Sequence, residues 1–162
     1  MSIRWVLNAS PVICLARAGY EHLLVNPTGQ ALLPMAVAEE IQAGPPNDPA
    51  RLLLETGIFL IIPTTEAPEV LAWDLGRGET AVLSYAYLNS GFTAIIDDLA
   101  ARKCARSLQI AHKGTLAVII MAKKQGLIPS AAEVLHKLIA VGLRLDEPLI
   151  RSALKETLNE DW

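Results

Sequence analysis

The chain has 162 residues and a formal net charge of −3 at pH 7, and 52% of its residues are hydrophobic, 19% charged and 5% aromatic. This composition excludes a disordered or fibrous chain and predicts one globular domain over residues 1–162 with a sizeable core. It also excludes a general cationic surface for nucleic acid, so such a contact would need a local patch or bound cations.

Cysteine usage and hydropathy predict a soluble cytoplasmic protein. Cys14 and Cys104 form no CxxC pair, which argues against a disulfide scaffold and for a reducing compartment. The most apolar windows, residues 58–62 and 115–122, are too short to span a bilayer.

Strand-like apolar runs alternate with helix-like segments along the chain. Residues 3–7 predict the first strand, and Pro11 predicts a helix start with Ser10 as the N-cap. Residues 43–49 predict a surface loop between two helices. Further strands are expected at residues 31–33, 57–62 and 92–96, and further helices from Pro34 onwards and at residues 78–88, 99–108, 114–125, 131–140 and 148–158. The alternation predicts an α/β fold with a parallel sheet covered on both faces.

Polar side chains follow two of the predicted strands. Asn8 comes after the first strand, and Asp97 and Asp98 come after the fourth. Ligands of parallel sheets bind beyond the carboxyl ends of the strands, which is where these side chains are expected. Asp98 is also well placed to cap the helix that follows, which is a purely structural role.

Two glutamates belong to the helices next to these strand ends. Glu79 shares a helical stripe with Val82, Leu83 and Ala86, so it projects from the face expected to be buried. A carboxylate there needs a partner or a cation. Alternatively, Glu79 reaches solvent from the first turn and only favours the helix dipole; its position alone leaves both readings open. Glu40 lies at the border of its helix's apolar line, able to reach a cleft, although a lone glutamate there is more often a surface residue.

The acids are more informative together than singly, because all come from strand ends or adjoining helices of one parallel sheet. Carboxylate and amide oxygens are hard ligands suited to Mg²⁺ or Mn²⁺, and such ions catalyse phosphodiester hydrolysis. The expected catalytic and metal-binding set is Glu40, Glu79, Asp97, Asp98 and Asn8.

Cationic residues follow the last of these acids. Arg102 and Arg106 are four residues apart on one helical face and could hold a phosphate backbone, or could form a solvated cationic face. Lys113 and Thr115 could face the same cleft, although Thr115 could instead cap its helix.

Other chemistry has less support. Three histidines, His22, His112 and His136, lack metal-ligand spacing. The sequence has no GxGxxG or P-loop pattern, which argues against a small-molecule phosphate enzyme.

Several segments in this order resemble the PIN-domain family, in particular prokaryotic predicted nucleic-acid-binding proteins related to VapC-type toxins. The matching segments are residues 7–19, 33–41, 75–86, 94–110 and 113–128. The resemblance implies a three-layer α/β/α domain with a central, mainly parallel sheet. It also implies an endoribonuclease that depends on Mg²⁺ or Mn²⁺, of the kind that is the toxin of a toxin–antitoxin pair, with RNA as substrate and an antitoxin protein as partner. The family's acidic positions carry over onto Glu40, Glu79 and Asp98, with Asp97 beside the last, and its small hydroxyl residue onto Ser10.

The chain departs from the family pattern at Asn8, where the family has an aspartate. An amide oxygen can bind Mg²⁺ but brings no negative charge, so metal binding and activation of water are expected to be weaker. The alternative function is therefore a catalytically weak or inactive PIN-like module that binds RNA or a protein partner. Apolar helices at both ends of the chain predict a homodimer.

Overall fold

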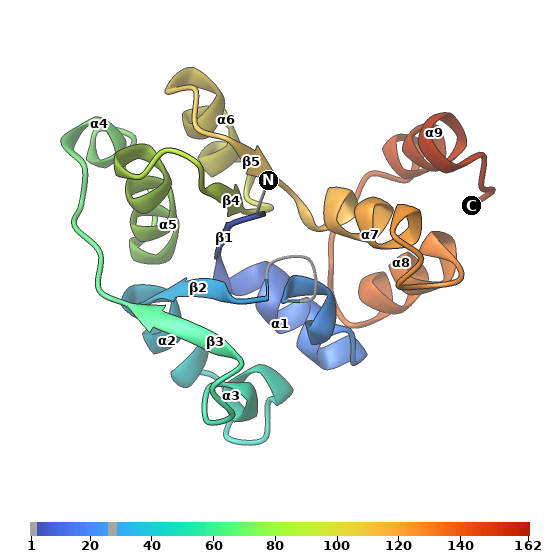
Figure 1. The fold of residues 1–162 in the computed structure, drawn as a ribbon, viewed down its shortest axis with the longest axis horizontal. Helices are drawn as coiled ribbons and strands as arrows, with labels where there is room; N and C mark the ends of the chain where they lie inside the picture. Colours follow the sequence, from blue (N-terminus) through green and yellow to red (C-terminus); the bar gives the residue numbers. More distant parts are fainter. Residues whose placement is uncertain (1–2, 26–28) are drawn as a thin grey trace.

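The computed structural model describes residues 3–25 and 29–162, and its centre is a five-stranded sheet (Figure 1). All strand pairs are parallel, in the order β3-β2-β1-β4-β5. The strands are β1 (Trp5–Leu7), β2 (Ala31–Pro34), β3 (Phe59–Ile62), β4 (Thr93–Ile95) and β5 (His112–Lys113). The predicted parallel α/β fold is therefore confirmed, whereas β5 was not predicted because two residues are too short to show a strand pattern.

Helices cover the sheet and complete the three-layer α/β/α arrangement that the family resemblance implies. They are α1 (Ala9–Ala18), the 3₁₀ helix η1 (Glu21–Leu24), α2 (Met35–Gln42), α3 (Pro49–Leu53), α4 (Pro68–Leu71), α5 (Arg77–Leu88), α6 (Leu99–Ser107), α7 (Thr115–Lys124), α8 (Ala131–Ala140) and α9 (Glu147–Leu158). Helix α5 packs against β1, β2 and β4, while α7 packs against α8 and α9 at one end of the molecule (Figure 1). None of the described helices is both long enough and apolar enough to cross a membrane.

The start of α1 differs from the prediction. The helix begins at Ala9 with Asn8 as its N-cap, so Ser10 is not the cap and Pro11 is not the first helical residue. Asn8 keeps the extended backbone of the strand, with φ −90° and ψ 166°. Pro11 is tolerated within the first turn because the first N–H groups of a helix have no intrahelical acceptor. The strand and helix therefore meet directly at Asn8.

Two further boundaries shift for similar local reasons. Pro34 is the last residue of β2, and α2 begins one residue later than predicted, at Met35. Gly114, and not Thr115, is the N-cap of α7. The loop at residues 43–49 was expected between two helices, and α3, which begins at Pro49, is the second of them. The short helices α4 and η1 were not predicted, since segments of four residues carry too little periodicity.

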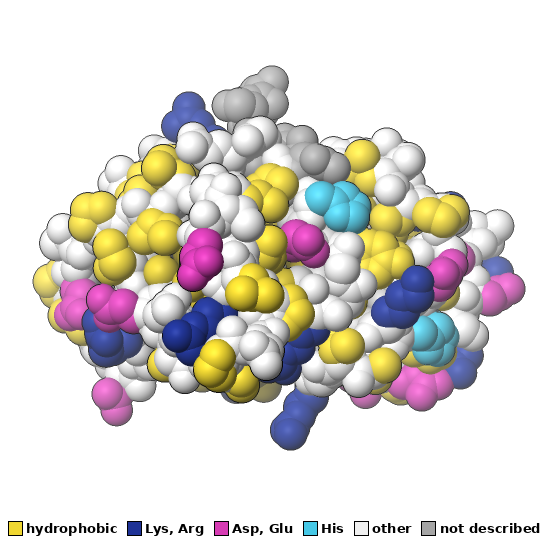
Figure 2. Space-filling model, turned by 90° about the horizontal axis from the view of Figure 1, so that it is seen from below, with side chains coloured by type: hydrophobic (Ala, Val, Ile, Leu, Met, Phe, Trp, Pro, Cys, Tyr) yellow, Lys and Arg dark blue, Asp and Glu magenta, His cyan; other side chains and the backbone are white. Residues whose placement is uncertain are grey.

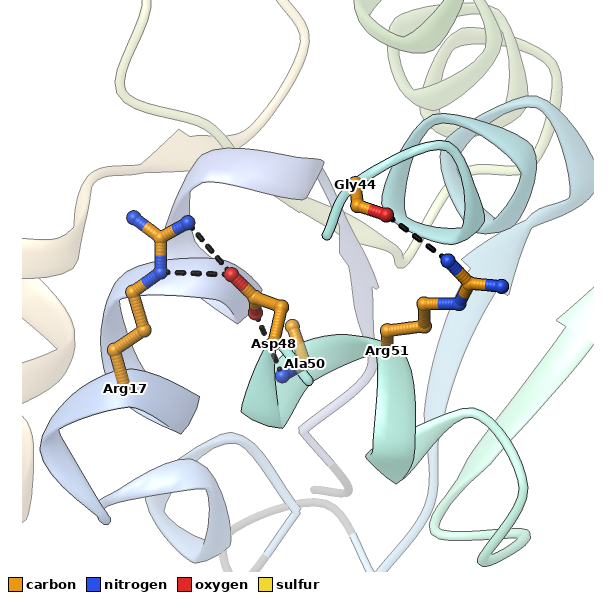
Figure 3. Close-up of polar contacts among 5 residues, drawn as sticks. All are labelled: Arg17, Gly44, Asp48, Ala50 and Arg51. Carbon is orange, nitrogen blue, oxygen red and sulfur yellow. Dashed lines mark hydrogen bonds and ion pairs between the residues drawn. The ribbon is translucent and has the colours of Figure 1, made fainter. Parts of the chain in front are cut away.

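The predicted loop after α2 is held by side chains of its neighbours (Figure 3). Arg17 of α1 donates to Asp48 Oδ2 from Nε at 2.9 Å and from a terminal nitrogen at 2.6 Å. The other Asp48 oxygen accepts from the Ala50 backbone N–H at 3.0 Å and so caps α3. Arg51 donates back to the Gly44 carbonyl at 3.0 Å. This loop is therefore fixed to α1, although its sequence is rich in Pro and Gly.

The core is built from the strands and the inner faces of the helices. Its largest fully buried side chains include Trp5, Leu33, Leu83 and Ile95, and the buried apolar residues form one cluster. Full burial of a side chain of this size stabilises the fold by roughly 1.5–3 kcal/mol. Cys14 and Cys104 are buried free thiols; burial raises the pKa of both, and at Cys14 the charge of Asp97 adds to the rise.

Candidate active site

The strand order places a topological switch point at the carboxyl end of β1, which is the position where open parallel sheets have their ligand crevice. From β1 the chain proceeds to β2 and β3 on one side, and it then crosses to β4 and β5 on the other. The loops that leave β1 and β4 therefore diverge, and ligands of open parallel sheets bind at such a switch point. Asn8 directly follows β1. Asp97 follows β4 after one intervening residue, Ile96. Because Leu7 is in register with Ile95, the two side chains leave the same edge of the sheet.

Asn8 lies directly at this switch point, where β1 ends. Its backbone N–H donates to the Ile95 carbonyl at 3.0 Å, which ties the end of β1 to β4. Asn8 is only 3% exposed, and its side chain makes no capping hydrogen bond. The amide oxygen Oδ1 is buried without a hydrogen-bond partner among the described residues. An unsatisfied buried acceptor lowers the stability of the fold by about 1–3 kcal/mol, so this oxygen is available to accept a hydrogen bond or to bind a cation.

Glu40 shares this place with Asn8, and Glu79 lies near enough to Glu40 for its charge to act on it. A Cβ at buried Gly78 would lie 3.3 Å from Asn8 Oδ1 and 3.7 Å from Glu40 Oε2, so both oxygens face this glycine. Glu40 as a residue is exposed, but its carboxylate lies beside buried Gly78. Burial, and next the negative charge of Glu79, raise the pKa of Glu40. Glu79 is half-buried in the first turn of α5. Asn8, Glu40 and Glu79 therefore form one group of oxygen donors, which we call the amide–glutamate group.

The adjacent aspartates have different surroundings. Asp97 Oδ1 accepts from the Thr115 backbone N–H at 2.7 Å, and its Oδ2 accepts from the Thr115 hydroxyl at 2.6 Å. Asp98 is exposed and accepts from the Ala101 backbone N–H at 2.9 Å, so it is the N-cap of α6, as its sequence position suggested. Of the pair, Asp97 is the carboxylate that lines the groove between α6, β5 and α7, and Asp98 is engaged by its helix.

Thr115 has a role that the sequence did not indicate. It is fully buried, so it cannot contact a long substrate directly, and both of its polar groups hold Asp97. The signal that could have revealed this is the pair Gly114–Thr115 after β5, since β5 lies next to β4 and brings Thr115 opposite Asp97.

The predicted cationic residues lie beside Asp97. A Cβ at Gly114 would be 3.0 Å from Asp97 Oδ1 and in contact with an Arg102 guanidinium nitrogen, so Arg102 passes over the acid. Arg102, Arg106 and Lys113 line one groove that begins at Asp97. Ser10 is exposed on the first turn of α1, where its side chain hydrogen-bonds with Cys14.

Among the expected site residues, the amide–glutamate group suits a hard divalent cation better than the full set of acids does. Within residues 3–25 and 29–162, no three His, Cys, Asp or Glu side chains converge closely enough to hold a metal ion, so the expected acids do not form one cluster. The amide–glutamate group nevertheless combines an unpartnered amide oxygen with two carboxylates that repel each other. A cation there would satisfy the amide and relieve the repulsion, and oxygen donors of this kind suit Mg²⁺ or Mn²⁺.

One face of the molecule carries mixed charge. On the face seen in Figure 2, Lys and Arg side chains are interspersed with acidic ones. This agrees with the net charge of −3 and limits any cationic contact to local features such as the groove beside Asp97.

The chain matches a known protein family. A family model described as a PIN domain covers residues 4–159, which is nearly the whole chain. No curated protein matches the chain. The matched range includes the amide–glutamate group, the Asp97–Thr115 pair and the cationic groove.

Proposed function

The chain belongs to the PIN-domain family, as its sequence predicts, and we propose that it is an endoribonuclease that depends on Mg²⁺ or Mn²⁺. PIN domains have a nuclease-type fold and generally use divalent metals. The observation that supports the proposal is the unpartnered Asn8 oxygen beside Glu40 at the switch point of the sheet, with the charge of Glu79 acting on Glu40. Glu40, Glu79 and Asn8 would hold the first ion, with Asp97 on the adjoining side and Asp98 outside the immediate set.

The roles of the other residues follow from their contacts. A bound ion would lower the pKa of a water molecule and offset negative charge on the phosphate. Thr115 donates to both oxygens of Asp97, which fixes the orientation of that carboxylate. Arg102 is the guanidinium beside Asp97 and is the natural contact for the phosphate, with Arg106 and Lys113 further along the groove.

The test is RNA hydrolysis in Mn²⁺ by the pure protein and by single variants. Glu79→Gln and Asp97→Asn should lower the cleavage rate at least tenfold because each removes one negative charge from the site. Asp98→Asn is the matched control, since asparagine is also a good N-cap, and its rate should stay near that of the parent. The assignment is wrong if Glu79→Gln and Asp97→Asn cleave as fast as Asp98→Asn.

A second function is favoured by Asn8, which stands where the family has an aspartate. The missing charge supports a weak nuclease or a binding module that holds RNA or a protein partner without cleaving it. Asn8→Asp should raise the Mn²⁺ affinity, measured by calorimetry, at least tenfold, and should raise cleavage with it. If affinity rises and the parent still binds RNA without cleaving it, the binding module is the better description. If neither affinity nor cleavage changes, Asn8 is not part of a metal site.

The family also supports a cytoplasmic toxin that is neutralised by an antitoxin protein. Induced expression should then arrest growth, and expression of Glu79→Gln at the same level should not. Equal arrest by both proteins would separate toxicity from nuclease chemistry. The homodimer expected from the sequence is a further proposal, which light scattering tests.

A further inference from the structure

The 10 glycines of the chain do not all have the same reason to be glycine. Six have a positive φ, between 71° and 115°, and a Cβ added to them would meet no described atom within 4 Å: Gly19, Gly29, Gly57, Gly91, Gly126 and Gly142. Backbone conformation explains these six, because residues with a side chain rarely adopt that region. Gly76 and Gly114 have ordinary extended backbones instead, with φ −61° and −95°, so any residue could adopt them.

Gly76 is the N-cap of α5 and Gly114 is the N-cap of α7, and neither helix has a side-chain cap. Ser, Asp and Asn are better N-caps, because their side-chain oxygen accepts from a free N–H of the first turn. The chain uses such residues elsewhere: Asp48 caps α3, Asp98 caps α6 and Ser130 caps α8. Helix capping therefore does not explain the glycines at these two positions.

The space that a side chain would fill explains them better. A Cβ at Gly76 would lie 2.5 Å from Glu79 Oε2, which is closer than non-bonded carbon and oxygen atoms approach. A Cβ at Gly114 would overlap the Arg102 guanidinium and lie 3.0 Å from Asp97 Oδ1. The charged ends of Glu79, Asp97 and Arg102 therefore occupy the places that side chains at the two glycines would take.

These three side chains all belong to the proposed site. Glu79 is a member of the amide–glutamate group, Asp97 is placed on its adjoining side, and Arg102 is the proposed phosphate contact. Each approaches its glycine with the end of a flexible side chain, so a larger residue would move that end and leave the backbone in place. A substitution at either glycine should therefore disturb the site while the fold stays intact.

We propose that Gly76 and Gly114 are positioning residues of the candidate active site. Gly76 leaves room for the Glu79 carboxylate to fold back over the start of α5, and Gly114 leaves room for Arg102 to pass over Asp97. What each glycine contributes is the absence of a Cβ. The inference rests on the proposed metal-dependent function, because the side chains that the glycines accommodate are those of the proposed site.

The test at Gly76 compares the Mn²⁺ affinity, measured by calorimetry, with the Tm of the metal-free protein. Gly76→Ala and Gly76→Ser should both weaken Mn²⁺ binding about tenfold, as expected when a residue that orients a metal ligand is changed. Their Tm should stay within about 2 °C of the parent, because only the end of Glu79 moves. Gly126→Ala is the matched control: φ is +75° there and the space is open, so alanine should lower Tm by about 4 °C and leave the Mn²⁺ affinity unchanged.

The test at Gly114 measures binding of a labelled unstructured RNA by fluorescence anisotropy without metal. Gly114→Ala and Gly114→Ser should each weaken binding about fivefold, which corresponds to one displaced charged contact near the surface. Gly114→Ser combined with Arg102→Gln should bind no more weakly than Arg102→Gln alone, because the glycine acts through Arg102.

Several results would overturn the inference and leave the proposed function standing. Gly76 variants that bind Mn²⁺ as tightly as the parent do so. A Gly76→Ser variant that keeps the affinity lost by Gly76→Ala also does so, because capping would then be the role of this position. Additive losses for Gly114→Ser and Arg102→Gln refute the role of Gly114. A parent that binds neither Mn²⁺ nor RNA contradicts the proposed function itself, and the inference with it.

Discussion

Replacing Thr115 by valine isolates the contact that holds Asp97. Valine keeps the volume and branching of the buried side chain and keeps the backbone N–H that donates to Asp97 Oδ1. It removes only the hydroxyl that donates to Asp97 Oδ2 at 2.6 Å. A hydrogen bond to a charged acceptor contributes about 1.5–3 kcal/mol. Asp97 is half-buried and keeps some access to water, so we expect a loss near the lower end, about 2 kcal/mol.

This loss is large enough to measure in two ways. For a chain of this length, 1 kcal/mol lowers Tm by roughly 2–4 °C, so Thr115→Val should melt about 4–8 °C below the parent. Its urea midpoint should fall by about 1 M. Thr115→Ser is the matched control, because it keeps the hydroxyl and loses one methyl group. If a metal binds beside Asp97, the Mn²⁺ affinity of the valine variant should also fall, since the carboxylate is freed to rotate.

The reasoning fails if valine and serine variants unfold within about 0.5 kcal/mol of each other, which is the range of an ordinary surface substitution. That result would mean that water satisfies Asp97 equally well once the hydroxyl is gone. Thr115 would then be a packing residue and not the residue that positions the carboxylate.

Two further predictions concern the remaining charged contacts. The pKa of Glu40 is raised above its ordinary value of 4.5, so the contribution of Glu40 to stability is fully present below pH 4.5 and is lost as pH rises through the raised pKa. Glu40→Gln should remove this loss from the pH dependence of urea unfolding, and an unchanged pH dependence would show that Glu40 does not cause it. Asp48→Ala removes both the cap of α3 and the contact with Arg17, so it should lower the free energy of unfolding by about 1–3 kcal/mol. Asp48→Asn keeps a capping oxygen and should lower it less. Equal losses in the two variants would assign the effect to the ion pair alone.

The sequence by itself determined the parallel α/β layout, because buried strands and amphipathic helices have different apolar periods. It also identified Asp98 as a helix cap and singled out Asn8, since both depend on neighbours along the chain. It placed Glu79 on a stripe shared with buried residues, and the structure finds Glu79 half-buried beside Glu40. Local pattern is sufficient where a residue's partner lies within a few positions of it.

Only the tertiary structure decided which aspartate lines the groove and which side chain holds it. Asp97 and Asp98 are adjacent, so no local pattern tells which one turns inward, and the answer comes from Thr115, 18 residues away. That contact depends on β5, whose two residues gain strand geometry only by pairing with β4. Arg144 joins the groove for the same reason: its neighbours there belong to α6 and α7, and three-dimensional packing brings them together.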